Sequence, residues 1–209
     1  MKKICALFMG LLLMFGLAAC GNNQQTGNEG DMTANNQAGS QTSPNASEKG
    51  KTLVAYFSAS GNTEAVASVI ANKTSGELFK LEPAEAYSSD DLDWTKSTSR
   101  VNKEHENESE RDIKLVSASV DNWDEYDTVF IGYPIWWGIA AWPVNEFVTA
   151  NDFTGKTVIP FCTSASSGIG ESGELLAKMA GTGNWQSGQR FRSSASDSDV
   201  TSWLDQLSY

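Results

Sequence analysis

The stretch TLVAYFSASGNT, from Thr52 to Thr63, decides how the rest of the chain is organised. It begins with an apolar run, Leu53 to Phe57, that predicts a short buried strand. Hydroxyl side chains and a glycine follow this run, and a helical pattern then begins. The spacing of the next apolar residues predicts one helix face, made of Ala65, Val66, Val69 and Ile70.

The polar turn between this strand and this helix suits an anionic phosphate. Backbone N–H groups at a helix start have no partner within the helix, and the helix dipole adds partial positive charge there. Ser58, Ser60, Asn62 and Thr63 add side-chain donors, and Gly61 lets the backbone close tightly. Because the loop holds no Lys or Arg, the sequence favours a phosphate bound by neutral donors over a triphosphate with magnesium.

Length and charge limit the function classes. The 209 residues carry a net charge of -11 and are 40% hydrophobic, which fits one globular domain with extensions. Such acidity argues against a nucleic-acid partner, because phosphate backbones are bound by clustered Lys and Arg. It is compatible with basic partner proteins, but an acidic surface also serves solubility alone.

Residues 1–19 predict a signal peptide rather than part of the fold. A charged start precedes an apolar run, Ile4 to Ala19, that is short for a membrane-spanning helix and ends in small residues. The junction at 17–21, LAACG, resembles a bacterial lipobox, which implies cleavage before Cys20 and lipidation of its thiol. We therefore expect an extracytoplasmic protein, anchored to the cell membrane through lipid. The alternative is an uncleaved signal anchor.

Residues 20–50 predict a flexible polar tether, because they are rich in Asn, Gln, Gly, Ser and Thr and almost free of large apolar side chains. The folded domain is predicted at 51–209. Cys162 is its single cysteine, and the apolar run before it favours a buried core residue over a nucleophile. With one His and no CxxC pair, the sequence predicts no metal site.

Strand and helix patterns alternate through this domain. Such alternation predicts an α/β fold with a parallel sheet and helices on both faces. In these sheets ligands bind beyond the carboxyl ends of the strands. The predicted strands are 52–57, 77–81, 128–132, 157–162 and 189–192, and the predicted helices are 63–74, one within 90–108, one starting near 143, 172–180 and 198–207.

Two further strand ends carry unusual turns. Tyr133 to Pro143 follows the third strand and holds several Trp residues where loops are normally exposed. These rings either cover a flat ligand by stacking or cap the core beneath them, and Trp142, at a helix start, favours the core. Thr163 to Gly170 follows the fourth strand and is a small, hydroxyl-rich loop that lets a ligand approach the backbone.

The three turns together resemble the flavodoxin family. SASGNT, at 58–63, matches that family's phosphate-loop signature S/T-x-S/T-G-N-T at every position, and YPIWWG and CTS end the third and fourth strands as in bacterial flavodoxin-like proteins. The resemblance implies a doubly wound five-stranded parallel sheet, in the order 2-1-3-4-5, that binds one FMN. It implies cofactor contacts by Ser58, Ser60, Gly61, Asn62, Thr63, Pro134, Ile135, Trp136, Trp137, Gly138, Thr163, Ser164, Ala165, Ser166 and Gly168.

The function that this resemblance implies is electron transfer. Together with the predicted lipid anchor, we expect it at the outer face of the cytoplasmic membrane, although small flavodoxins are typically cytoplasmic carriers. The partner is then a redox protein or a small electron acceptor. Only Tyr133 among the residues of these loops offers acid–base chemistry, so a redox carrier is favoured and no catalytic residue is assigned. The alternatives are a small FMN-dependent NAD(P)H or quinone reductase and a lipoprotein that binds flavin or another phosphorylated ligand without redox function.

The segment from Tyr87 to Arg111 is longer than a minimal connection between strands. One interpretation is a solvated helix packed at the edge of the domain. The other is a lid over the flavin edge, with Arg100 or His105 meeting a substrate or partner. Because Glu104 and Glu106 flank His105, the sequence predicts an exposed, charged face there.

Overall fold

The computed structural model describes residues 50–208. The predicted signal peptide, the predicted lipid site at Cys20 and nearly all of the predicted tether lie outside the described residues. Within that range no helix combines the length and the apolar character that a bilayer crossing requires.

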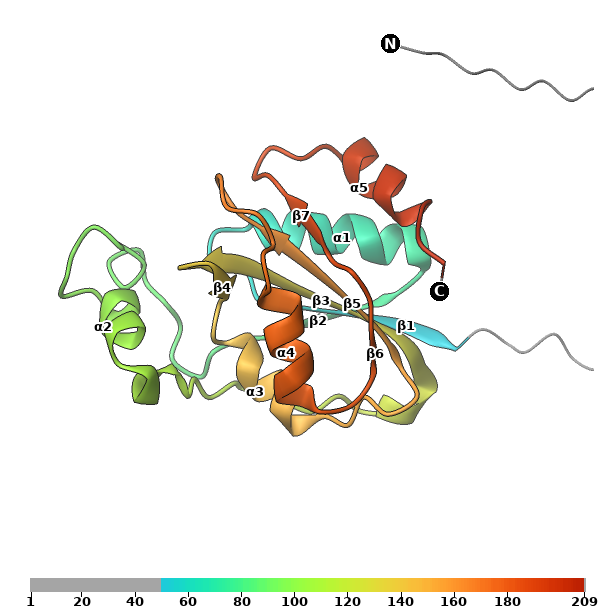
Figure 1. Ribbon diagram of the computed structural model, residues 1–209, viewed down its shortest axis with the longest axis horizontal. Coiled ribbons are helices and arrows are strands. Elements are labelled where there is room, and N and C mark those ends of the chain that lie inside the picture. The colour runs from blue at the N-terminus through green and yellow to red at the C-terminus, as the bar shows by residue number, and fades with distance from the viewer. Residues whose placement is uncertain (1–49, 209) are drawn as a thin grey trace, which may run out of the picture. The chain divides into compact units, whose positions relative to one another are not determined.

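A parallel sheet forms the centre of the described chain (Figure 1). Its strands follow the order β2-β1-β3-β5-β6, which confirms the predicted order 2-1-3-4-5. The fifth place is shared by two short strands, β6 and β7, which both pair with β5. The bounds are Lys51–Tyr56 for β1, Glu77–Lys80 for β2, Tyr126–Trp136 for β3, Thr157–Thr163 for β5, Asn184–Trp185 for β6 and Gln189–Phe191 for β7.

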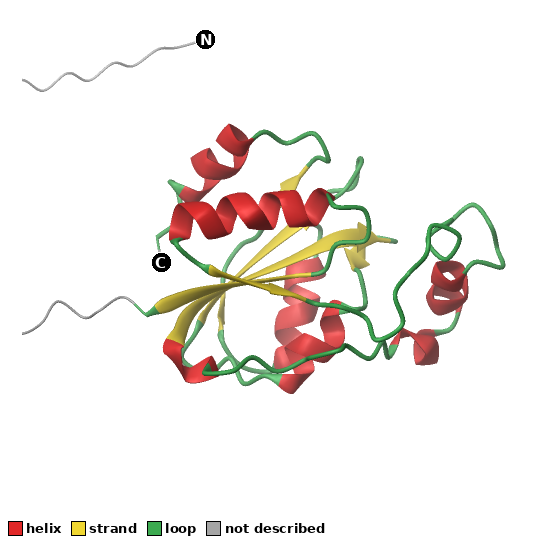
Figure 2. Cartoon of the chain, turned by 180° about the vertical axis from the view of Figure 1, so that it is seen from behind, coloured by secondary structure: helices red, strands yellow, loops and turns green. Residues whose placement is uncertain are grey.

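Helices cover both faces of the sheet (Figures 1 and 2). On one face lie α1, Asn62–Thr74, and α5, Asp197–Leu204. On the other lie α3, Val144–Ala150, and α4, Ser172–Ala180. The predicted α/β class with helices on both faces is therefore confirmed.

The central strand β3 shows why this sequence folds into two layers of core. Val129, Phe130 and Ile131 are fully buried, and their side chains alternate between the faces. Phe130 packs in the cluster of α1 and α5, whereas Val129 and Ile131 pack in the cluster of α3 and α4. A strand buried on both faces needs a continuous apolar run, which is what the sequence supplies.

The strand β3 continues beyond its predicted end at residue 132. It runs to Trp136 and folds back as β4, Ile139–Ala140, which pairs antiparallel with it. The two residues between them, Trp137 and Gly138, have positive φ of 46° and 84°, as in a two-residue type I′ turn. The predicted open turn is therefore a β-hairpin, and Tyr133 and Pro134 belong to the strand.

An insertion, residues 82–116, leaves the sheet after β2 and returns before β3. It projects beside the carboxyl ends of the strands in Figure 1 and contains α2, Arg100–Glu106, and a 3-10 turn η1, Glu108–Arg111. The helix predicted within 90–108 is shorter than expected. Its first half forms polar turns instead, because Asp91 bonds to Ser88 and Asp93 bonds to Thr95. A second 3-10 turn, η2, Trp123–Glu125, leads into β3.

Candidate functional site

The loop after β1 closes tightly at the start of α1. Gly61, with φ of 86°, is the residue before the helix and has no side chain with which to cap it. The hydroxyl of Ser58 accepts the N–H of Glu64 at 3.2 Å, and the amide of Asn62 donates to Ser60 Oγ at 3.1 Å. The loop's side chains therefore brace its shape.

The backbone of this loop presents a series of unused donors. Among the described residues, no acceptor receives a hydrogen bond from the N–H groups of residues 58–63. These groups lie at a helix start, where the dipole adds positive potential, and consecutive free N–H groups form an anion-binding concavity. The donor set is neutral and fits a phosphate group.

The loops after β1 and β5 are joined by a buried contact. Thr63 Oγ1 and Thr163 Oγ1 lie 2.8 Å apart, and both residues are buried. These two predicted cofactor residues therefore bond to each other through their hydroxyls. The bond uses only the side-chain hydroxyls, so it does not occupy the backbone groups of the two residues.

The loop after β5 is held by a residue that sequence reasoning missed. Arg190, in β7, donates from Nε to Ser164 Oγ at 2.9 Å and from its guanidinium to Ser164 O at 2.8 Å. Ser164 Oγ in turn donates to the carbonyl of Ser167. The predicted residues Ala165, Ser166 and Gly168 are exposed on this fixed loop. The sequence offered one signal for this role: Arg190 is a basic residue in a predicted strand, and the loop after β5 is rich in serine.

The β3–β4 hairpin lies next to this loop. A Cβ added to Gly170 would lie 3.8 Å from Gly138 O, so the hairpin tip and the third loop are neighbours. Ile135 and Trp136 are half-buried, and Trp137 is 43% exposed. Trp142 is 1% exposed, which confirms its predicted place in the core.

Two reactive side chains near the loops are inert. Tyr133 is fully buried and its hydroxyl lies 3.0 Å from Ser172 Oγ, and burial raises the pKa of the phenol well above its usual value. Cys162 is also fully buried, and burial raises the pKa of its thiol to about 12. The prediction that Cys162 is a core residue is confirmed, and Tyr133 is not placed to exchange protons at the loops.

A buried carboxylate in α2 helps to join the insertion to the rest of the domain. Glu104 is 3% exposed, so the prediction that it lies on an open face is wrong. It accepts hydrogen bonds from Tyr87 OH and Trp142 Nε1, both at 2.7 Å, and from Arg100 Nε at 2.6 Å. These bonds hold α2 against the start of α3.

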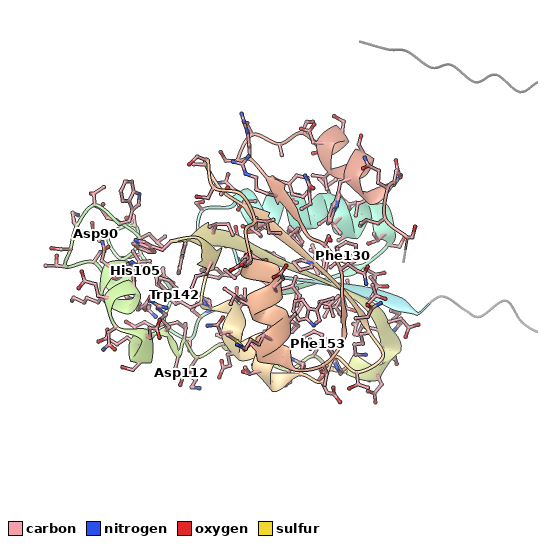
Figure 3. The ribbon with its side chains drawn as sticks, in the orientation of Figure 1. Asp90, His105, Asp112, Phe130, Trp142 and Phe153 are labelled. Atoms are coloured by element: carbon pink, nitrogen blue, oxygen red, sulfur yellow. The ribbon has the colours of Figure 1, made fainter. Side chains whose placement is uncertain are left out.

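Figure 3 labels His105 and Trp142, which both lie at this junction and stack on Trp137. The His105 ring stacks on Trp137 with centroids 4.2 Å apart and an angle of 12°. Arg100 is committed to Glu104 and to the carbonyl of Glu85. The insertion therefore packs against the domain edge, with His105 against the tip of the hairpin.

The fold and the loops define a doubly wound α/β protein with an anion-ready loop at the carboxyl ends of its strands. The sequence model of the flavodoxin family matches residues 51–207. The chain belongs to the flavodoxin family.

Solved structures of related proteins agree with this assignment. A candidate flavoprotein from Bacteroides eggerthii is 39% identical, with 75% of this chain and 96% of that chain covered and a TM-score of 0.67. One from Bacteroides uniformis is 38% identical, with 76% and 100% covered and a TM-score of 0.69. A flavoprotein from Lactobacillus acidophilus, solved in complex with FMN, is 24% identical, with 74% and 99% covered and a TM-score of 0.54, which shows a shared fold. No curated protein matches the chain.

Proposed function

We propose that this protein binds FMN non-covalently and acts as an electron-transfer flavoprotein. The observation that carries the proposal is the loop after β1, whose N–H groups at 58–63 have no acceptor among the described residues. A phosphate monoester at a helix start satisfies such donors without a metal or a basic side chain. Ser58, Ser60, Gly61, Asn62 and Thr63 would hold this phosphate.

The flavin ring would lie between the hairpin and the third loop. Gly138 and Gly170 are neighbours there, and Trp137 is 43% exposed at the tip of the hairpin. The residues that would contact the ring are Pro134, Ile135, Trp136, Trp137 and Gly138 on one side and Thr163, Ser164, Ala165, Ser166 and Gly168 on the other. FMN would supply the electron-transfer chemistry, while the protein binds and orients it. The FMN complex of the Lactobacillus acidophilus protein of the same fold supports this choice of cofactor.

A carrier is favoured over an enzyme because of Tyr133. The loops' one candidate for acid–base chemistry is buried and bonded to Ser172, so it is not positioned to serve a substrate. A carrier needs only an exposed flavin edge and a partner, either a redox protein or a small acceptor. The two rival functions remain testable: turnover with NAD(P)H and a quinone would identify a reductase, and flavin that stays oxidised with every donor would identify a non-redox binder.

An FMN titration tests the phosphate loop with a matched pair of variants. Gly61 and Gly155 both have positive φ, of 86° and 79°, and a Cβ at either would meet nothing within 4 Å. Alanine therefore strains the backbone similarly at both sites, but only Gly61 lies in the loop. We expect Gly61→Ala to weaken FMN binding about tenfold and Gly155→Ala to leave it unchanged.

The readouts are retained flavin absorption after removal of free FMN and quenching of flavin fluorescence. Wild-type protein that retains no flavin would refute FMN as the cofactor. Equal losses of affinity in the two variants would show that the loop after β1 is not the phosphate site.

We also propose that the protein is exported and anchored to the outer face of the cell membrane through lipid on Cys20. The proposal rests on the sequence of residues 1–21. Cys20→Ser should move the protein from the membrane fraction to the soluble fraction and abolish incorporation of labelled fatty acid. If Cys20→Ser stays in the membrane fraction and the wild type incorporates no labelled fatty acid, the protein is held by an uncleaved signal anchor instead.

A further inference from the structure

A small cavity lies between the insertion and the β3–β4 hairpin. Its volume is about 240 Å³, and its lining is Leu92, Trp94, Val101, Ile135, Trp136 and Trp137. We propose that this cavity, the insertion pocket, binds one flat, uncharged aromatic or quinoid ring system. Its role as the site for a small electron acceptor rests on the proposed function, whereas the binding itself does not.

The chemistry of the walls selects an uncharged ring. None of the lining side chains carries a charge, and half of them are indoles. Trp94 is 71% exposed, and its ring contacts no other aromatic ring within residues 50–208. An indole face in that position gains both apolar burial and stacking when a flat ring covers it.

The size of the pocket favours one or two rings over a whole nucleotide. Pockets for drug-sized ligands usually measure roughly 300–1,000 Å³, and this one is smaller. A nicotinamide dinucleotide also carries phosphates, and none of the lining side chains is charged or carries a hydroxyl or amide group. One or two fused rings match both the volume and the polarity.

The insertion pocket approaches the hairpin from the insertion, through Leu92, Trp94 and Val101. It shares Ile135, Trp136 and Trp137 with the place proposed for the flavin ring. Gly138 O lies beside Gly170 of the third loop, whereas Trp137 stacks on His105 of the insertion. No residue of the loop after β1 or of the loop after β5 lines the pocket. Trp136 and Trp137 would therefore border both ligands.

Hydrogen bonds hold the backbone of the insertion that forms part of the pocket wall. Asn102 Nδ2 donates to Trp94 O at 2.9 Å and to Lys96 O at 2.8 Å, which holds the loop that carries Trp94. Val101 is buried, and Glu104 bonds α2 to Trp142. A preformed wall lowers the ordering cost of binding.

The test is isothermal titration of the full chain into 2,3-dimethyl-1,4-naphthoquinone. This bicyclic quinone is uncharged, and its methyl groups block addition of cysteine thiols to the ring. We expect saturable binding that Trp94→Ala weakens about tenfold and Trp94→Phe largely retains, because phenylalanine still offers a stacking face. Val116→Ala is the matched control, since Val116 is 69% exposed on the same insertion and lies outside the pocket.

Three results would overturn the inference: no saturable binding by the wild type, equal affinity in the wild type and Trp94→Ala, or displacement of the quinone by FMN or NADH. Displacement by FMN would mean that the pocket belongs to the flavin site. If the wild type binds the quinone but retains no FMN, the proposed cofactor is refuted and the proposed quinone site is still supported. Unchanged FMN affinity in Trp94→Ala would support two separate sites.

Discussion

The sheet domain and the insertion are stabilised in different ways. The sheet is packed on both faces by large apolar clusters that include β1, β3, β5 and four helices. The insertion buries Val101 and Ile113 in a small cluster with Trp142, and its Tyr87 and Leu115 are only partly buried against the large cluster. Its attachment depends instead on the hydrogen bond from Trp142 to Glu104, on Arg111, which lies 5.2 Å from the centre of the Trp142 ring, and on the stack of His105 on Trp137.

This difference teaches that the two regions can open separately. Apolar clusters are lost cooperatively, whereas a junction made by a few polar groups can break alone. The insertion is also closed at its base, where Pro83 pairs with Leu115 and Val116 N donates to Glu82 O at 2.8 Å. We therefore expect it to loosen from the hairpin while the sheet remains folded.

The largest expected effect comes from the sheet. Ile131→Ala removes a fully buried side chain from the central strand and should lower the free energy of unfolding by about 3 kcal/mol. Urea unfolding followed by tryptophan fluorescence and by circular dichroism should shift together. Separate shifts of the two signals would contradict a single cooperative sheet domain.

A smaller and local effect is expected at the junction. Glu104→Ala leaves Tyr87 OH, Trp142 Nε1 and the Arg100 guanidinium without their buried acceptor, which costs roughly 2 kcal/mol. Hydrogen exchange and limited proteolysis should increase within residues 82–116 and remain unchanged in β3.

The neighbouring variant Glu106→Ala is the control for this change, because Glu106 is exposed on the same helix. It should alter neither measurement. Faster exchange throughout β1, β3 and β5 in Glu104→Ala would show that the insertion and the sheet unfold as one unit.

The smallest effect concerns a polar contact on the surface of the sheet domain. Asp199 caps α5 by accepting from the backbone N–H and the hydroxyl of Ser196, and these bonds lower the pKa of its carboxyl. Because the folded-state pKa lies below the unfolded value, the contribution to stability is present at neutral pH and is lost as pH falls through the folded-state pKa.

The corresponding test compares urea midpoints of the wild type and Asp199→Asn. The wild type should have the higher midpoint at neutral pH, and the difference should shrink towards roughly pH 3, below the usual carboxyl pKa. A difference independent of pH would mean that the carboxylate charge plays no part in the cap.

Most of the sheet domain was predictable because local patterns and burial agree there. The runs before Ser58 and Cys162 are continuous and apolar, as buried parallel strands require, and α4 was predicted at its observed bounds. The loop SASGNT carries its geometry in its own residues, since Gly61 adopts the positive φ that glycine permits.

The remaining features depend on contacts between distant segments. A hairpin with Trp137 at positive φ has no local sequence signal, because a bulky residue rarely adopts that conformation. Glu104 stands between charged neighbours and is buried only because Tyr87, Arg100 and Trp142 converge on it from three segments. Arg190 likewise gains its role only when β7 pairs with β5.

The hydroxyl pair of Thr63 and Thr163 has a consequence for the order of synthesis. The two residues are 100 positions apart, so the contact between the loops after β1 and β5 forms only after the chain has emerged past Thr163. The contact that joins the phosphate loop to the loop after β5 thus forms well after the phosphate loop's own residues have appeared. A phosphate ligand that favours the braced loop would act as a checkpoint, retained by chains whose β5 has already joined β3.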